Sequence, residues 1–315
     1  MSEPRVAALV LNYNGPRVTL ETLDSLVAMR SPGTELMVID NGSTDDSHEQ
    51  VRRRFPDLRQ LRVRENRGIS WGLDHGLQVA LDEGFDYALV MNNDIEAHPE
   101  MLVEMLAVTE ADPEVGCVGV KAYYHSDRGR IWSAGGILRF REAITRERGE
   151  GELDRGQYDR TEEVPYVNGV AMLIRRNVLE RIGLWDPAYF LGVEDADFCV
   201  RARRAGFRCV YAHRAVLWHM ISASIGVYKP FRTFHTARST AIFLRKYAAP
   251  HQWASSLLWF VAALPVAWLR ELPRGNQRAV HAKVRGLLDG LRAPLPPLPT
   301  AVRDLVPPSA PEASP

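Results

Sequence analysis

The chain has 315 residues, of which 46% are hydrophobic and 25% are charged, and these values fit one large globular domain or two smaller ones. Lys and Arg together number 39, as do Asp and Glu, and this balance argues against a non-specific nucleic-acid binder, which needs a basic excess. The three cysteines (Cys117, Cys199 and Cys209) form no CxxC pair, which argues against a disulfide framework and a zinc site. We expect buried thiols in a reducing compartment.

The N-terminal part of the chain alternates between short apolar segments and amphipathic segments. We expect strands at 6–14, 35–40, 61–66 and 85–94, and helices at 19–29, 46–55 and 67–84. This alternation predicts an α/β fold in which helices cover both faces of a mostly parallel sheet. The apolar run that begins at Val6 is short and has no basic leader, so we interpret it as a strand and expect a cytoplasmic protein.

Polar residues recur where the expected strands end. They form four clusters, at 12–14, 40–45, 66–67 and 92–94. In open α/β sheets the ligand crevice lies outside the carboxyl ends of the strands. Four such clusters in succession therefore predict a pocket of nucleotide size.

The middle of the chain changes character. The segment from Thr145 to Glu163 is charged and rich in glycine, so we expect a mobile excursion rather than part of the core. Strand character returns at 164–176, and a short helix is expected at 177–182.

The C-terminal part begins with a mixed aromatic and basic helix at 231–247 and continues with a nearly apolar segment, 253–269. The apolar segment is shorter than the roughly 20 residues that cross a bilayer, and Pro265 interrupts it. Five basic residues follow (Arg270, Arg274, Arg278, Lys283 and Arg285). Two interpretations stay open: a helix in a membrane interface beside anionic lipid, or a helical hairpin buried against the main domain.

These shifts in composition divide the chain into three parts. We expect a main domain at 1–225, a helical and conditionally membrane-associated segment at 226–292, and a disordered proline-rich tail at 293–315.

Two of the strand-end clusters contain candidate ligands. Asp94 ends the turn MNND, where a carboxylate can hold Mg²⁺ or Mn²⁺ together with phosphate oxygens, although Asn and Asp also fill turns for backbone reasons. Asp40 begins DNGSTDDS and can accept a hydrogen bond from a base or a ribose. A turn and a helix cap explain Gly42, Asp45 and Ser47 but leave Asp40 unexplained.

The most acidic point of the chain is EDAD, at the start of an expected helix. Asp197 and Arg201 are four residues apart and can pair on the helix surface. Either Glu194 or Asp195 can act as the N-cap, and the remaining carboxylate can accept a proton from an incoming hydroxyl. The helix end favours the ionised form that a base requires.

A single histidine, His219, lies in the otherwise apolar run AVLWHMIS. A lone histidine in such a run is usually a satisfied core residue. It becomes a candidate metal ligand only if Asp94 already holds a cation.

Seven motifs follow one another along the chain: NYNG, VIDNGSTDD, ENRGISWGLDHG, LVMNNDIEAHP, YVNGVAMLIRR, GLWDPAYFLGVEDADFCVRARRAG and LWHM. In this order they resemble the inverting family-2 glycosyltransferases, most of all the bacterial rhamnosyltransferase-like branch, over roughly Val6 to Met220. The resemblance implies the GT-A fold, a Rossmann-like sheet that binds a nucleotide-diphosphate sugar with Mg²⁺ or Mn²⁺, here with a C-terminal helical extension.

The resemblance also implies roles for the matching residues. Asp195 matches the general base, and Glu194, Trp185 and Asp186 would lie at the acceptor. Asp94 and His219 would ligate the cation, and Asn92 replaces the first carboxylate of the DxD motif of the family. The nucleotide and donor sugar would be bound by Tyr13, Asn14, Asp40, Asn41, Arg67, Gly68, Asn92, Asn93, Asn168 and Gly169, with Asp40 on the base.

The activity that the resemblance implies is a single displacement that inverts the anomeric carbon and needs no protein nucleophile. The donor would be dTDP-rhamnose or, second, a UDP-linked sugar. The acceptor would be a growing glycan or a lipid-linked oligosaccharide in cell-surface polysaccharide synthesis. The enzyme would act in the cytoplasm, at the inner face of the membrane if its C-terminal helices touch lipid, and a homo-oligomer stays open.

Two other functions compete with this one. A sugar-nucleotide nucleotidyltransferase would need a glycine-rich, basic loop after the first strand, where only Gly15 and Arg17 are present. A non-catalytic nucleotide-sugar-binding scaffold would have no need to retain both Asp94 and Asp195. Glycosyl transfer accounts for more of these residues than either alternative.

Overall fold

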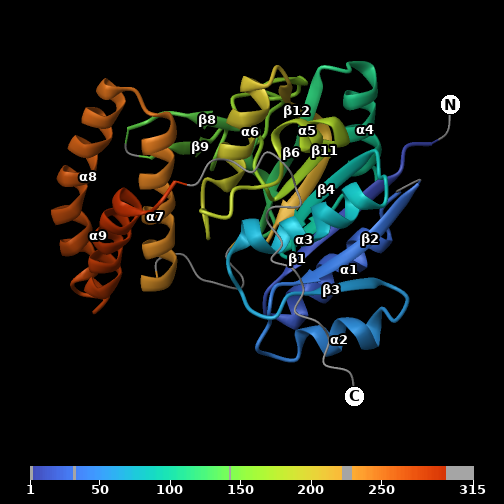
Figure 1. Ribbon diagram of the computed structural model, residues 1–315, viewed down its shortest axis with the longest axis horizontal. Coiled ribbons are helices and arrows are strands. Elements are labelled where there is room, and N and C mark those ends of the chain that lie inside the picture. Colours follow the sequence, from blue (N-terminus) through green and yellow to red (C-terminus); the bar gives the residue numbers. More distant parts are fainter. Residues whose placement is uncertain (1–2, 31–32, 142, 222–228, 296–315) are drawn as a thin grey trace.

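Figure 1 shows the computed structural model, which describes residues 3–30, 33–141, 143–221 and 229–295. The strands are β1 (Val6–Asn12), β2 (Thr34–Asp40), β3 (Arg59–Arg62), β4 (Tyr87–Asn92), β5 (Ile95–Ala97), β6 (Val115–Tyr124), β7 (Asp127–Ser133), β8 (Gly136–Leu138), β9 (Thr145–Glu147), β10 (Glu162–Glu163), β11 (Ala171–Arg175) and β12 (Arg208–His219). The helices are α1 (Pro16–Val27), α2 (Ser47–Arg54), α3 (Ile69–Asp82), α4 (Met101–Ala111), α5 (Arg176–Ile182), α6 (Glu194–Arg204), α7 (Pro230–Tyr247), α8 (Pro250–Glu271) and α9 (Gln277–Arg292).

Ten strands form one sheet, with a path β10-β12-β6-β11-β4-β1-β2-β3 to which β5 and β7 are added. The strands β3, β2, β1 and β4 run parallel, as the alternation of strands and helices predicts, and β6 and β12 are also parallel. In contrast, β11 is antiparallel to both β4 and β6, so it begins at the edge where β4 ends. The expected α/β architecture is confirmed.

Two apolar cores lie on opposite faces of the sheet. Along β1 the side chains of Val6, Ala8 and Val10 belong to one core, with residues of α1 and α4, while Leu9 and Leu11 belong to the other, with residues of α3 and α6. This division follows from the two-residue period of a strand. Burial on both faces is the reason why β1 is apolar along nearly its whole length.

The segment from Thr145 to Glu163 differs from the expected excursion. It contributes β9, which pairs with β8, and β10, which pairs with β12. Lys121 of β6 is buried and donates to Asp154 at 2.9 Å, and Arg148 lies over the rings of Tyr158 and Tyr211. The charges of this segment therefore form specific contacts with the sheet.

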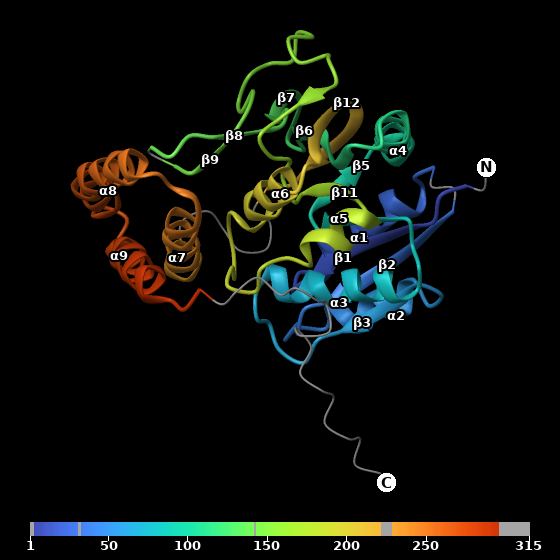
Figure 2. The ribbon, with the colours of Figure 1, turned by 45° about the horizontal axis from the view of Figure 1, so that its top comes forward.

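The three C-terminal helices form a unit beside the sheet (Figure 2). Helix α9 packs closely on α7 because Gly286 and Gly290 face the backbone of α7, where a Cβ on Gly286 would come within 2.1 Å of the Phe234 carbonyl oxygen. The β8–β9 loop extends toward α8, and the Ser256 hydroxyl donates to the carbonyl of Phe140 at 3.0 Å.

Helix α8 corrects two expectations for the apolar segment. It is a continuous helix of 22 residues that includes Pro265, so by length and composition it passes as a membrane-spanning candidate. Only 6% of the most apolar 18-residue stretch of α8 is buried inside the protein. The buried-hairpin interpretation is therefore wrong for α8. The expected boundary at residue 225 and nearly all of the expected tail lie outside the described residues.

Candidate active site

The polar residues that follow the parallel strands meet at one edge of the sheet. In the parallel pair of β1 and β2, Asn12 lies opposite Asp40, and on the other side of β1, Leu11 lies opposite Asn92 of β4. Because the carboxyl ends of parallel strands share an edge, the loops that follow these three strands are neighbours. The convergence expected from the sequence is observed.

Asp40 is almost fully buried at this edge. Its Oδ1 accepts hydrogen bonds from the Asn12 amide and the Ser43 backbone N–H, both at 3.3 Å. Its Oδ2 lies 3.2 Å from Nε of Arg62, whose side chain is half exposed. A ligand that donates a hydrogen bond to Asp40 would bind beside this guanidinium. The expected contact between Asp40 and the nucleotide base stays a prediction.

The loops after β1 and β2 are bound to each other. Asn14 has a positive φ of 59°, and its side-chain oxygen accepts the backbone N–H of Thr44 at 2.9 Å, while its own N–H donates to Ser43 Oγ at 3.0 Å. Tyr13 is partly exposed between these contacts. A nucleotide would meet a pre-formed loop pair here.

The loop before α3 closes the same edge. The Asn41 amide donates to the carbonyl of Gly68 at 3.1 Å, and Gly68 has a φ of 108°, at which a Cβ would come within 2.6 Å of the Phe190 Cα. Only glycine fits this approach. Arg67 pairs with Glu65 and lies over the Trp71 ring at 5.2 Å, so its guanidinium stays at the surface of the loop.

The two asparagines of MNND have different surroundings. The backbone N–H of Asn92 donates to Val170 at 3.1 Å, which joins β4 to the strand that follows Gly169. The Asn93 amide is buried and donates to Asn12 at 3.1 Å and to Thr19 at 2.8 Å. Asn93 therefore stabilises the loop from inside, whereas the Asn92 side chain is partly exposed at the edge.

Asp94 and His219 are adjacent although they are 125 positions apart in the sequence. The antiparallel pair of β5 and β12 places His219 opposite Ile95, and His219 Nε2 lies 3.2 Å from Asp94 Oδ1. Both side chains are buried, and Asp94 Oδ1 and His219 Nδ1 accept or donate no hydrogen bond within the described residues. Trp132 packs edge-on against the imidazole, with ring centroids 4.3 Å apart.

This pair fits a hard divalent cation whose other ligands come from elsewhere. Across the residues that the structure describes, no group of three or more His, Cys, Asp or Glu side chains gathers as a metal site. Mg²⁺ is often held by one or two protein ligands together with substrate phosphates and water, and an imidazole also suits Mn²⁺. One buried carboxylate beside one imidazole, with no third such ligand among the described residues, is such a partial ligand set.

Asp195 lies where β11 begins, in the first turn of α6. Its Oδ2 accepts the backbone N–H of Gly169 at 3.0 Å, and its Oδ1 accepts that of Ala196 at 2.7 Å. The side chain of Asn168, the residue before Gly169, donates to Ser133 at 2.9 Å, next to Trp132 of the Asp94 and His219 site. Asp195 is thus linked to the pair of Asp94 and His219 through two short segments, 168–169 and 132–133, at one edge of the sheet.

Burial raises the pKa of both carboxyl groups at the front of α6. The pKa of Glu194 rises to about 8, because desolvation and the charge of Asp195 both disfavour its ionised form. Desolvation also raises the pKa of Asp195, while the N–H groups of Gly169 and Ala196 oppose this rise. The pKa direction is opposite to that expected from the helix end alone, and Glu194 is the member of the pair that keeps its proton at neutral pH.

Glu147 is a neighbour of Asp195 that the sequence did not single out. It ends β9 and accepts hydrogen bonds from the Asn168 amide at 3.0 Å and the Tyr166 hydroxyl at 2.8 Å. Burial, with a further contribution from the charge of Asp195, raises its pKa to about 7. Its only signal in the sequence is a place in a charged segment that looks like a surface loop.

Trp185 and Asp186, which the resemblance places at the acceptor, are both buried. Trp185 is 1% exposed, stacks on Phe198 and touches the Cα side of Gly169, so it supports the backbone that binds Asp195. The Asp186 carboxylate is buried, accepts the N–H of Ala188 and pairs with Lys246 at 2.8 Å. Their side chains are occupied by packing and pairing, which leaves them as supports of the site.

The N-terminus of α6 also corrects the expected cap. The N-cap is Val193, with a positive φ of 61° and no side-chain hydrogen bond, so neither Glu194 nor Asp195 caps the helix. The expected pair of Asp197 and Arg201 is present at 2.8 Å, but it is buried. The three cysteines are free and buried, as expected.

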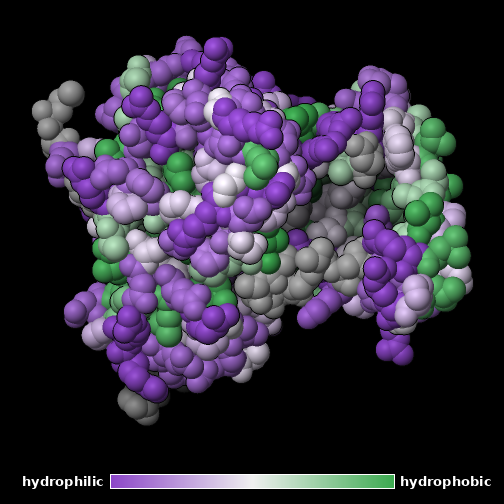
Figure 3. Space-filling model, turned by 180° about the vertical axis from the view of Figure 1, so that it is seen from behind, coloured by the Kyte–Doolittle hydropathy of each residue, from purple (hydrophilic) through white to green (hydrophobic). Residues whose placement is uncertain are grey.

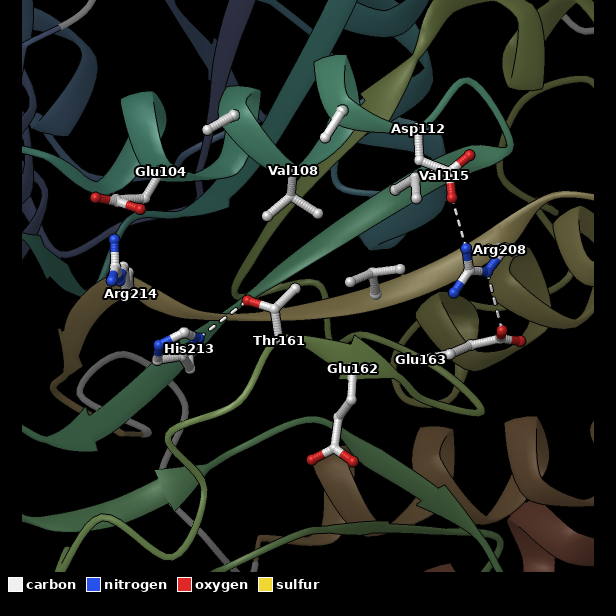
Figure 4. A pocket seen from close by; sticks show the side chains of 13 residues that line it. Glu104, Val108, Asp112, Val115, Thr161, Glu162, Glu163, Arg208, His213 and Arg214 are labelled. Atoms are coloured by element: carbon white, nitrogen blue, oxygen red, sulfur yellow. Dashed lines mark hydrogen bonds and ion pairs between the residues drawn. The ribbon is translucent and has the colours of Figure 1, made fainter.

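A cavity of about 390 Å³ lies away from this edge, between α4, β10 and β12 (Figure 4). Some of its polar side chains are already paired: Arg208 contacts Asp112 and Glu163, and Thr161 contacts His213 at 3.0 Å. None of the expected site residues lines it.

The chain is similar to several curated proteins. The chain is 30% identical over 236 residues to the uncharacterized protein y4gI of Sinorhizobium fredii, a match that covers 71% of this chain but only 25% of that protein. It is 25% identical over 271 residues to the N-acetylglucosaminyl-diphospho-decaprenol L-rhamnosyltransferase of Mycobacterium tuberculosis, over 75% of this chain and 84% of the relative.

Solved structures share the fold. A mannosyltransferase from Pyrobaculum calidifontis, solved with GDP-Man and Mn²⁺, superposes with a TM-score of 0.56 at 20% identity, over 92% of this chain and 88% of that one. GalNAc-T7, solved with UDP, GalNAc and Mn²⁺, gives a TM-score of 0.58 at 12% identity, over 77% and 48% of the two chains. At these identities the likeness shows the GT-A fold alone.

The model of the family described as "Glycosyltransferase like family 2" matches residues 4–240, which span the whole sheet, the Asp94 and His219 pair, and Asp195. The chain belongs to glycosyltransferase family 2.

Proposed function

We propose that the chain is an inverting glycosyltransferase that moves a sugar, rhamnose first among the candidates, from a dTDP- or UDP-linked donor to a hydroxyl of a glycan or lipid-linked acceptor. The observation that carries the proposal is the position of Asp195. Its carboxylate is held by two backbone N–H groups at the sheet edge that also contains Asp40 and Asp94.

The geometry of Asp195 suits a general base. Each carboxylate oxygen accepts one backbone N–H, and each has a second lone pair for an incoming hydroxyl. Asp195 would take the hydroxyl proton while that oxygen attacks the anomeric carbon opposite the leaving diphosphate. The raised pKa of the neighbouring Glu194 disfavours a second negative charge directly beside Asp195.

A divalent cation would be held by Asp94 and His219, and when bound it neutralises charge on the leaving diphosphate. Asp94 and His219 lie at the end of β4 and β12, and Asp195 lies at the start of α6. A donor sugar would occupy the edge between them, beside Asn168 and Gly169.

Relatives favour a particular substrate class. The name of the M. tuberculosis relative describes transfer of L-rhamnose to a diphospho-decaprenol-linked sugar, and the match covers most of that protein. An acceptor with a lipid carrier would suit a cytoplasmic enzyme that works at the inner face of the membrane, in cell-surface polysaccharide synthesis.

The direct test is release of nucleoside diphosphate. The full chain is incubated with dTDP-rhamnose or UDP-linked sugars, Mn²⁺ and a candidate acceptor, and the glycosylated product is identified by mass spectrometry. Donor selection can precede it by thermal shift, since a ligand at about 100 times its Kd stabilises by about 2.7 kcal/mol. Failure of every nucleotide sugar both to bind and to turn over would overturn the proposal.

Metal removal tests the cation site separately. Asp94 and His219 supply only part of a ligand set, so the cation should be held weakly enough for EDTA to remove it. EDTA should therefore abolish transfer, and added Mn²⁺ or Mg²⁺ should restore it. The substitution His219→Ala should raise the Mn²⁺ concentration needed for half-maximal rate. Full activity in EDTA would remove the roles given to both residues.

A further inference from the structure

A second cavity, of about 370 Å³, lies between the C-terminal helices and the main domain. Its walls come from α7, α8 and α9, from the loop between β8 and β9, and from the two residues before α6. The wall residues are mostly aliphatic and aromatic, among them Leu244, Trp253, Phe260 and Leu287. The volume falls within the range of small-molecule sites, about 300–1,000 Å³.

One end of this cavity reaches the candidate active site. Gly192 and Val193 line it, and the next two residues are Glu194 and Asp195. Thr145 also lines it and begins β9, the strand that ends with Glu147. The wall of the cavity is therefore two residues along the chain from the proposed base, which does not itself line it.

The other end opens at the exposed face of α8. Leu257 and Trp259 line the cavity and are nevertheless 56% and 48% exposed. The same helix also exposes Leu258, Val261 and Val266, and Figure 3 shows hydrophobic residues gathered on the outer side of the three-helix unit. An apolar chain could enter from this face without crossing a polar surface.

Two cationic side chains line the cavity: Arg141, which is exposed, and Lys283, which is partly buried within the apolar wall. Lys283 of α9 lines the cavity, and its Nζ lies 5.7 Å from the centroid of the Phe260 ring. No carboxylate pairs with Lys283 in the part of the chain that the structure describes. Burial and the charge of Arg270 lower the pKa of Lys283. An anion beside Lys283 would therefore offset the free-energy cost of burying its ammonium charge.

We propose that this cavity binds the hydrocarbon chain of a lipid-linked acceptor, and that Lys283 holds the phosphate to which the chain is attached. The inference rests on the proposed function, because it gives the acceptor a binding site next to Asp195. An apolar chain matches the aromatic and aliphatic wall, a phosphate matches the unpaired ammonium, and the continuity with Val193 brings the sugar end to the base.

The test uses dodecyl phosphate below its micelle concentration as the probe, with the full chain. Binding is followed by tryptophan fluorescence, since Trp253 and Trp259 line the cavity. We expect dodecyl phosphate to bind at least about tenfold more tightly than either inorganic phosphate or dodecanol, about 1.4 kcal/mol in each comparison. Equal affinity for inorganic phosphate, or no binding of the alkyl phosphate, would overturn the proposal.

Two substitutions with matched controls locate the probe. Ala263→Phe fills the cavity and should weaken binding at least about tenfold. Ala262→Phe adds the same ring at the adjacent exposed position outside the lining, and it should bind as the wild type does. Lys283→Gln should weaken dodecyl phosphate but not dodecanol, whereas Arg285→Gln on the same helix should change neither. Unchanged binding in Ala263→Phe places the probe elsewhere and refutes the site.

Other occupants give different results. If bilayer lipid fills the cavity, Ala263→Phe should reduce binding to phosphatidylglycerol vesicles while dodecyl phosphate binding is unchanged. If a second copy of the chain fills it, the probe affinity should fall as protein concentration rises. Either result would overturn the proposal.

The cavity and the proposed function can fail separately. Asp195→Asn should bind dodecyl phosphate as the wild type does, because Asp195 does not line the cavity. Transfer without probe binding would remove only the cavity assignment. If the protein binds the probe but turns over no nucleotide sugar, the proposed function is removed. The lipid in the cavity could then no longer be identified as the acceptor.

Discussion

The two sides of helix α6 treat neighbouring carboxylates in opposite ways. On one side, Asp197 contacts Arg201 at 2.8 Å, Tyr247 at 2.7 Å and also Lys246. The two cations, with the Tyr247 hydrogen bond, lower its pKa although burial opposes this. On the other side, burial raises the pKa of Glu194 and Asp195, which no cation contacts among the described residues. Partners, rather than residue type, decide the direction in which the pKa of each carboxyl group shifts.

Helix geometry separates the two sides. At 3.6 residues per turn, Asp195 and Asp197 point about 200° apart, one toward the sheet edge and the other toward α7. Asp197 therefore joins the catalytic helix to the C-terminal unit, and Asp195 faces Gly169. The same four-residue stretch supplies both an anchor and the proposed base.

The largest expected effect comes from the reactive side. Asp195→Asn keeps the shape of the side chain but removes its basicity, so turnover should fall by about 10²–10⁴. The measurement is the rate of nucleoside diphosphate release with saturating donor and acceptor. Donor binding by thermal shift is the control and should persist. Turnover near that of the wild type would remove the assignment of Asp195 as the base.

The structural side should respond in stability. Asp197→Ala leaves Arg201 and Lys246 without their shared partner in a buried setting, so the free energy of unfolding should fall by about 3–5 kcal/mol. Urea denaturation measures this change. Asp289→Ala is a matched control, because it removes a half-exposed partner of Arg238 on α9 and should cost about 1 kcal/mol or less. Equal losses in the two variants would contradict the anchoring role of Asp197.

The sequence predicts best the elements that are buried on both faces. The apolar run of β1 could be identified because its side chains fill two cores, and α1, α2 and α3 differ from their expected ends by a few residues. Strand β3 lies at the edge of the sheet and is rich in arginine, so the expected segment begins two residues late. An edge strand carries a weaker apolar pattern.

Contacts between distant segments are what the sequence could not supply. Asp197 and Lys246 are separated by 49 positions, and no local pattern indicates that they pair. Glu147 is buried only because the β8–β9 hairpin brings it against Asn168 and Tyr166. The order of the motifs indicated Asp94, Asp195 and His219, whereas the residues that position them follow from packing alone.

A further expected effect concerns how stability depends on pH. The pKa of Glu194 is raised to about 8 in the folded protein from its ordinary value of 4.5, so between these pH values the folded chain holds a proton that the unfolded chain releases. The stability contributed by neutral Glu194 is therefore fully present below about pH 4.5 and is lost as the pH rises through about 8. Glu194→Gln cannot ionise and should lose less stability than the wild type over this window.

Melting temperatures of the two proteins, compared at intervals from pH 5 to 8.5, measure this difference directly. Glu147, whose pKa is raised to about 7, contributes to the pH dependence of both proteins and so cancels in the comparison. Glu114→Gln, at an exposed position, controls for loss of a surface carboxylate. If the Glu194→Gln curve runs parallel to that of the wild type, Glu194 is ionised across the window. The front of α6 would then carry two adjacent charges, and the two sides of the helix would differ only in whether cations contact their carboxylates.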